Sequence, residues 1–245
     1  MIGWHCPPIE SAIQGRGYSA AMGTLYLVRH GQASLGASDY DQLSELGQRQ
    51  SVRLGEYLAS KNLHFTSVLH GSLRRHAQTW AGIEAGMAGK RALVPLVWPG
   101  LDEYHSEALI QALQPGAHAR PTTPDTTRAH FRLLRQALQQ WAGGALNPPG
   151  MPRYRDFVAG VCAALEHVRT QCEGAVLLVS SGGPIATAVA QILGASPQAF
   201  VELNLRLRNT ALTEFTFNAK HHALLSFNNL PHLDAPQYAD WQSYA

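Results

Sequence analysis

The chain is poor in charge and in cysteine, and each shortage argues against a class of protein. Charged residues make up 15% of the 245 residues and the net charge is +2, with no long basic run, so no nucleic-acid partner is expected. No apolar segment approaches the ~20 residues of a membrane-spanning helix, so no membrane partner is expected either. Three cysteines, Cys6, Cys162 and Cys172, lack metal-binding spacing. Their odd number argues against a disulfide framework and favours a reducing, cytoplasmic location.

The first 21 residues carry no clear structural signal. They lack a basic segment followed by an apolar one, so no secretory signal is expected, and we expect residues 1–21 to be a disordered extension. Met22 stands just before the first convincing strand, which leaves open whether translation begins at Met1 or Met22. Residues 22–245, with a chain that is 45% hydrophobic overall, are expected to form a single domain with a sizeable core.

Strand-like and helix-like segments alternate along this domain. Four apolar runs are expected to be strands: 24–28, 65–70, 92–98 and 175–179. The third should lie at an edge, because Pro95 cannot donate to a neighbouring strand. Residues 210–218 and 222–228 predict a β-hairpin. The pattern predicts an α/β three-layer sandwich, in which helices flank a mainly parallel central sheet.

Proline-rich residues 115–152 differ in composition from their surroundings and predict a helical insertion. Within it, a helix near 126–142 carries Phe131, Leu134, Leu138 and Trp141 at helical spacing. We expect this stripe to pack on the main domain and the insertion to shape access to a pocket. A further helix is expected from Ser72, with that serine as its N-cap.

The residues that suit chemistry follow the strands. Arg29, His30 and Gly31 come after the first, and Arg75 and His76 follow the second. The carboxylates and histidine of "LDEYH" come after the third, and "SSGG" at 180–183 leads from the fourth into a helix. Ligands of open α/β sheets bind at the carboxyl ends of strands. Cations, carboxylates and a helix N-terminus meeting there suit a phosphate, with a histidine as nucleophile.

Four motifs then resemble a known family in their order and spacing: "LYLVRHG", "LSELGQRQ", "GSLRRHAQT" and "VSSGGPI". Together they are similar to the histidine phosphatase superfamily, the phosphoglycerate-mutase-like group, over about residues 24–230. The resemblance implies that His30 is the nucleophile that accepts the phosphoryl group, and that Gly31 leaves room for the phosphate. Arg29 and Arg75 would bind its oxygens and supply the positive charge, so no metal or other cofactor is expected.

The resemblance also implies a general acid and places Asn209 near the pocket. The acid would be Glu103, although an ordinary solvated carboxylate beside Asp102 is an alternative at this stage. One position departs from the family, whose members usually read S-H-G-G at the last corner. Here Ser181, before Gly182, stands where a second histidine is expected against the phosphate.

The loss of that histidine weakens the predicted site without abolishing it. A hydrogen bond to a charged group contributes ~1.5–3 kcal/mol, so the handicap is about ten- to a hundredfold in rate. Either His105 or His76 could restore a proton donor near the phosphate, and His105 is preferred from its position after Glu103. A purely structural role is the alternative for both histidines.

Three functions are compatible with these residues. The first is a phosphomonoesterase working through phosphohistidine on a small phosphorylated substrate. The second is a phosphoglycerate mutase, which is weakened because Gly36 stands where the family's mutases usually carry asparagine. The third is a phosphate-binding protein without catalysis, motivated by Ser181. The sequence indicates neither the substrate nor the oligomeric state.

Overall fold

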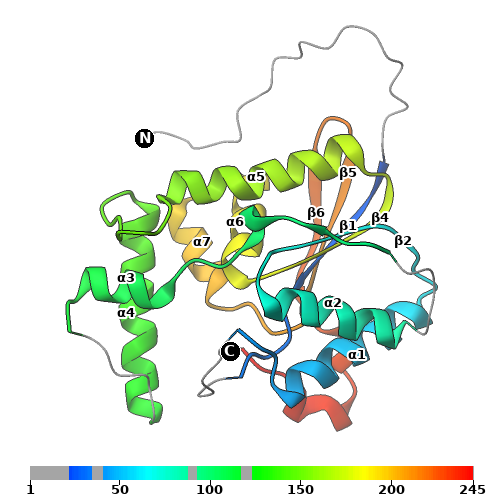
Figure 1. Cartoon of the computed structure of the whole chain (residues 1–245), viewed down its shortest axis with the longest axis horizontal. Helices are drawn as coiled ribbons and strands as arrows, with labels where there is room; N and C mark the ends of the chain where they lie inside the picture. The colour runs from blue at the N-terminus through cyan, green and yellow to red at the C-terminus, as the bar shows by residue number, and fades with distance from the viewer. Residues whose placement is uncertain (1–21, 35–40, 88–92, 117–122, 245) are drawn as a thin grey trace, which may run out of the picture.

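One twisted sheet organises the part of the chain that the computed structural model describes, residues 22–34, 41–87, 93–116 and 123–244. The expected extension at 1–21 and Gly36 lie outside these ranges. Six strands form the sheet in the order β3-β2-β4-β1-β5-β6 (Figure 1). They are β1 Met22–Arg29, β2 Phe65–His70, β3 Leu96–Val97, β4 Gly174–Ser180, β5 Leu212–Asn218 and β6 His222–Asn229.

The strand directions agree with the sequence prediction of a mainly parallel sheet. Strands β1 to β4 pair in parallel, and β5 and β6 add an antiparallel hairpin beside β1. Strand β3 lies at the edge as Pro95 predicts, but it is shorter than the predicted run. The carboxyl ends of β1, β2 and β4 therefore meet at one side of the sheet.

Helices cover both faces of the sheet, which confirms the three-layer α/β sandwich. Helices α1 and α2 pack together on one face, and α5 and α6 lie on the other (Figure 1). Their bounds are α1 Glu45–Ser60, α2 Arg74–Gly86, α3 Ser106–Leu113, α4 Pro124–Ala142, α5 Tyr154–Gln171, α6 Gly182–Ile192 and α7 Pro197–Asn204, with 3-10 turns η1 Pro99–Leu101, η2 Pro231–Leu233 and η3 Pro236–Trp241. The short helices α3 and α7 and the 3-10 turns were not predicted, because segments of this length carry too few periods of a hydrophobic pattern.

Side chains that alternate along the buried strands pack into two hydrophobic clusters, one on each face of the sheet. Leu25 and Leu27 of β1 belong to the core cluster that contains Val161 of α5, whereas Val28 belongs to the cluster that contains Leu54 of α1. Successive side chains of a strand point to opposite faces, so a run that is apolar throughout is expected where helices cover both. The unbroken apolar sequence of β1 is thus explained by burial on two sides.

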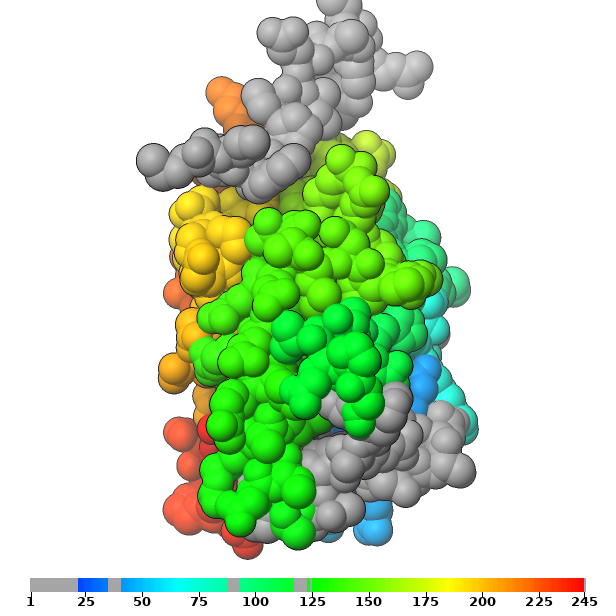
Figure 2. Space-filling view, turned by 90° about the vertical axis from the view of Figure 1, so that its left-hand side faces the viewer, coloured from blue at the N-terminus to red at the C-terminus, as the bar shows by residue number. Residues whose placement is uncertain are grey.

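Helix α4 of the expected insertion joins the main core. Leu134, Leu138 and Trp141 are buried in the same cluster as α5 and α6, and α4 packs against α3 and α7. Figure 2 shows α3 and α4 side by side at the surface. Phe131 departs from the prediction: it lies near the N-terminal end of the stripe and is 42% exposed. The stripe packs through Leu134, Leu138 and Trp141 but not through Phe131.

The start of α2 differs from the prediction of a serine cap. Its N-cap is Leu73, and the Ser72 hydroxyl donates to a carboxylate oxygen of Asp102. The helix is capped from a distant loop instead, because Oδ2 of Asp41 accepts the Arg74 backbone N–H at 2.8 Å. A negative charge at a helix N-terminus is favourable, and the same carboxylate can serve a neighbouring arginine.

Two features bear on the expectations drawn from composition. Cys162 is disulfide-bonded and Cys172 is a buried free thiol, so the odd number of cysteines did not exclude a disulfide bond. In the part of the chain that the structure describes, no helix combines the length and the apolar character needed to cross a bilayer.

Candidate active site

His30, directly after β1, is held rigidly by its own backbone. Its N–H donates to the Ser180 carbonyl of β4 at 2.8 Å, and its carbonyl accepts from the Asn209 side-chain amide at 3.1 Å. The side chain is 4% exposed. Its Nδ1 lies 2.7 Å from the Gly31 carbonyl oxygen, which can only accept, so Nδ1 carries the proton and Nε2 keeps its lone pair.

The electrostatic environment keeps this imidazole neutral. Burial lowers the pKa of His30 well below its ordinary value of 6.5, and the positive charges of Arg75 and Arg29 lower it further. A neutral ring with a free Nε2 lone pair is the form that attacks an electrophile. The same two cations attract the anion that would carry the electrophilic phosphorus.

Gly31 allows the loop after β1 to approach α1 closely. A Cβ at Gly31 would collide with the backbone carbonyl of Gly47 in α1, and a Cβ at Gly47 would collide with the carbonyl of Gln32. The two glycines therefore let α1 pack directly on the loop after β1. The room for a phosphate that the resemblance implies for Gly31 stays a prediction.

The two arginines expected to bind phosphate have different surroundings. Arg75 is 7% exposed, its Nη1 donates to Asp41 at 2.7 Å, and its Nη2 lies 3.5 Å from the Ser181 hydroxyl. Arg29 is half-buried and donates through Nη1 to the carbonyls of Leu207 and Tyr244. Arg75 is therefore aimed at the β4–α6 corner, whereas Arg29 also anchors the C-terminal segment.

Glu103 lies against the N-terminus of α6, where backbone groups and burial hold its carboxylate. Its Oε1 accepts the Gly183 backbone N–H at 3.0 Å and the Tyr104 N–H at 3.3 Å. Burial raises the pKa of this carboxyl above its ordinary value, while Arg75, the Gly183 N–H and Arg29 act in the opposite direction. Gly183 has no room for a side chain, because a Cβ would meet Oε1 of Glu103.

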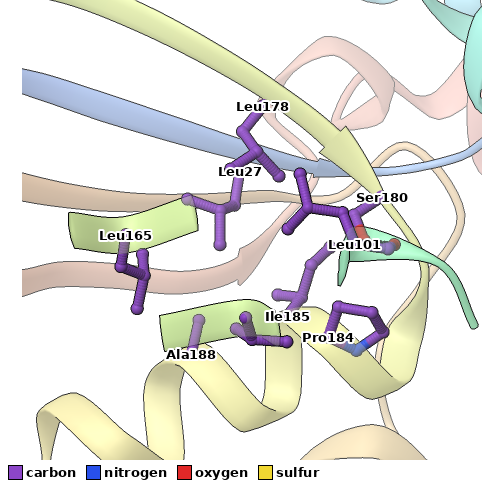
Figure 3. Close-up of a pocket in the computed structure, with 9 residues that line it drawn as sticks. Leu27, Leu101, Leu165, Leu178, Ser180, Pro184, Ile185 and Ala188 are labelled. Carbon is purple, nitrogen blue, oxygen red and sulfur yellow. Dashed lines mark hydrogen bonds between the residues drawn. The ribbon is translucent and has the colours of Figure 1, made fainter. Parts of the chain in front are cut away.

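An apolar layer lies between the sheet and the start of α6. Leu27, Leu178 and Ile185 pack under the corner (Figure 3). At its upper edge the Ser180 hydroxyl donates to the Leu101 carbonyl at 2.6 Å, which ties η1 to β4. Glu103 follows η1 by two residues, so this bond helps to position the Glu103 carboxylate.

Ser181 points into the site instead, so the two adjacent serines have different contacts. It is fully buried, and its hydroxyl lies 2.7 Å from Nε2 of His76, which is also fully buried. The His76 ring stands 5.8 Å from the His30 ring. Of the two auxiliary histidines considered from sequence, His76 is the one brought to Ser181, whereas the preferred His105 is exposed at the start of α3.

Asn209 supports the site from behind. Besides donating to the His30 carbonyl, it accepts from the Ser243 hydroxyl at 3.0 Å, and its N–H donates to the Ser243 carbonyl at 2.8 Å. Gly182, the other residue predicted to bind phosphate, is the first residue of α6, and a Cβ there would approach Oδ1 of Asn204 at 2.6 Å.

Several supporting residues were missed in the sequence analysis. Asp41 binds Arg75 and caps α2, and Thr79 accepts the Gly31 N–H at 3.0 Å. Gln50 accepts the Gln32 N–H at 2.9 Å and donates to the Trp241 carbonyl. Thr79 and Gln50 belong to the motifs quoted in the sequence analysis, so the sequence did point to them. Asp41 lies outside these motifs, and no pattern in the neighbouring sequence pointed to it.

Comparison with known proteins identifies the family of the chain. The model of the histidine phosphatase superfamily (branch 1) matches residues 25–230. The chain therefore belongs to that superfamily, as the motifs indicated. A comparison with curated protein sequences found no match.

Solved structures share the fold at low identity. One is a mycobacterial glucosyl-3-phosphoglycerate phosphatase in complex with VO3, with a TM-score of 0.61 and 24% identity over 85% of this chain and 100% of that one. Another structure of the mycobacterial phosphatase holds inorganic phosphate, with a TM-score of 0.61 and 23% identity over 86% and 100%. A phosphoglycerate mutase from Bacillus anthracis has a TM-score of 0.61 and 18% identity over 87% and 96%.

Proposed function

We propose that the chain is a phosphomonoesterase that acts through a phosphohistidine on His30. The observation that carries the proposal is the buried, neutral His30 with a free Nε2 lone pair, gathered with Arg75 and with Glu103. The substrate is a small phosphorylated molecule. The arginines supply the positive charge that the phosphate oxygens require, so no metal takes part in the proposal.

In the first step, Nε2 of His30 attacks phosphorus in line with the ester bond. The Nε2–P bond forms, the P–O ester bond breaks, and protonated Glu103 transfers its proton to the leaving oxygen. Arg75 and Arg29 stabilise the charge on the equatorial oxygens. The raised pKa of Glu103 favours its acid form, which this step needs.

In the second step, water hydrolyses the phosphohistidine. Glu103, now a carboxylate, accepts a proton from the attacking water. The new P–O bond forms, the Nε2–P bond breaks, and inorganic phosphate leaves with His30 neutral again. The cycle restores both residues to their starting states.

Labelling of His30 tests the proposal directly. The protein is mixed with a reactive phosphate monoester such as p-nitrophenyl phosphate, quenched in base and analysed for acid-labile phosphate. We expect the label on His30, turnover of the monoester, and neither in a His30→Ala variant. Turnover that persists in His30→Ala would overturn the proposal.

The same assay separates the two alternatives. A phosphate-binding protein without catalysis would bind phosphate but remain unlabelled, and a mutase would become labelled and return the group to another position of 3-phosphoglycerate. Gly36, the sequence argument against a mutase, lies outside the described residues. The contact between Ser181 and His76 weakens the argument for a protein without catalysis, since a second imidazole adjoins Ser181 despite the substitution.

A further inference from the structure

A buried pair of side chains remains unused by this mechanism. His76 of α2 and Ser181, the N-cap of α6, are both fully buried, and 2.7 Å separates Nε2 from the hydroxyl oxygen. Arg75 Nη2 lies 3.5 Å from the same oxygen. A phosphoryl group bound by Arg75 and attacked by His30 is therefore next to Ser181, with His76 behind it.

Charged and titratable groups surround His76 from several elements. Arg75 precedes it on α2, His70 ends β2, and the His30 ring follows β1 at 5.8 Å. Across from them, Oδ1 of Asp102 lies 3.8 Å from Nδ1. Burial lowers the pKa of His76 well below 6.5, and Arg75 and His70 lower it further, so the ring is neutral before an anion binds.

The surroundings of Nδ1 decide which nitrogen of the neutral ring carries the proton. Nδ1 makes no hydrogen bond within the described part of the chain, but it faces the carboxylate of Asp102, and the Gly71 backbone acts to raise the pKa of the ring. Both neighbours favour a proton on Nδ1. Nε2 is then an acceptor, and the Ser181 hydroxyl donates to it. In this state the serine presents only lone pairs to an arriving phosphate.

We propose that His76 takes up a proton when a dianionic phosphate group binds, so that the Ser181 hydroxyl reverses direction and donates to a phosphate oxygen. This inference rests on the proposed function, because it concerns the same phosphate site. Doubly protonated His76 donates from Nε2 to Ser181, whose own proton is then released toward the anion. His76 is a positioning residue that acts through the serine.

The physical driving force is the charge of the ligand. A dianion beside a buried site of low dielectric favours the cationic imidazole, and Asp102 on the far side stabilises it further. Without the proton, two sets of lone pairs would face each other across the Ser181–phosphate contact. Binding and protonation are therefore linked, and weaker binding is expected at high pH.

Sulfate is a suitable probe, because it remains a dianion over the whole working pH range. Its binding to a His30→Gln variant is measured calorimetrically at neutral pH in buffers of different ionisation enthalpy, which gives the protons taken up. We expect sulfate binding to take up roughly one proton fewer in the double variant His30→Gln/His76→Gln than in His30→Gln alone. An exposed histidine in the β5–β6 turn provides the matched control, His221→Gln, with uptake unchanged.

Moving the imidazole from position 76 to position 181 provides a kinetic test in the active protein. Loss of the relay in His76→Ala should lower kcat/KM about ten- to a hundredfold. Because the two side chains touch, the space vacated by His76 lies next to residue 181. The double variant His76→Ala/Ser181→His, which supplies an imidazole from the other wall, should then recover most of this loss.

The two experiments distinguish failure of this inference from failure of the proposed function. Unchanged proton uptake on adding His76→Gln, with His30 still labelled in the wild type, would overturn the role of His76 alone. Loss of activity in His76→Ala without recovery in the double variant, while both proteins remain folded, would also overturn it. Absent labelling with His76-dependent proton uptake would overturn the phosphatase and leave the linkage intact.

Discussion

The role of Glu103 is tested most sharply by Glu103→Gln. The amide has the same size, and its remaining carbonyl oxygen can still accept the Gly183 N–H that Oε1 accepts at 3.0 Å. What is lost is the transferable proton and the basic carboxylate. General acid–base catalysis contributes 10²–10⁴-fold in rate, or about 3–5 kcal/mol, so kcat should fall within this range.

The same substitution should not destabilise the protein at neutral pH. Burial raises the pKa of Glu103 in the folded state, so the folded protein binds this proton more tightly than the unfolded chain does. Stability from this group is therefore present at low pH and is lost as pH rises through the ordinary value toward the raised one. The neutral amide avoids that loss, and the variant should be at least as stable as the wild type at pH 7.

The assay compares substrates by leaving group and follows unfolding in parallel. An alkyl phosphate should suffer the full loss in Glu103→Gln, whereas p-nitrophenyl phosphate, whose leaving group needs little protonation, should still label His30. Hydrolysis of the label should be slow, because the base is missing, so phosphohistidine should accumulate. An equal loss for both substrates, or a lower melting temperature at pH 7 but not at pH 4, would refute the reasoning.

Three further substitutions test close packing, hydrogen bonding and the burial of a histidine. Gly31→Ala should cost about 1–3 kcal/mol in denaturant unfolding, because its Cβ collides with the Gly47 carbonyl, and an unchanged midpoint would contradict this. Asn209→Ala removes the donor to the His30 carbonyl and should slow labelling while costing about 1–3 kcal/mol of stability; unaltered labelling would be against it. Burial lowers the pKa of His232 from 6.5 to about 3, so wild-type stability should fall as pH drops through this window. The His232→Gln variant should lose less stability than the wild type over that pH window, as measured by thermal unfolding at each pH.

The sequence was sufficient where the signal is local. The limits of β2 were predicted as found, and the periodic face of α5, Phe157, Val161 and Leu165, is buried as its spacing required. Such segments interact with the core through their own repeating pattern, so tertiary context adds little to the prediction. The position of His30 followed equally well, since residues directly after a buried parallel strand lie at the carboxyl end of the sheet.

Prediction failed where a contact joins distant segments. Ser72 was expected to cap α2, but Asp41 does so from a loop 33 residues before Arg74. The stripe on α4 suggested that Phe131 is buried, yet periodicity alone cannot say where along a helix the neighbouring surface ends. Asn209 was expected near the pocket, but its bonds to Ser243 at the C-terminal end could not be inferred from either segment.

The difference between His76 and His105 follows from the same limitation. Both stand shortly after a strand or the turn that continues one, so their positions along the chain made them comparable candidates. Only the packing of α2 against the β4–α6 corner separates them: it buries His76 against Ser181 and leaves His105 exposed. A hydrogen-bond donor stabilises an anion in this site when it lies in the right position, whichever segment of the chain supplies it. An imidazole entering from α2 can therefore serve a corner whose own residue is a serine, provided that the hydroxyl between them can turn.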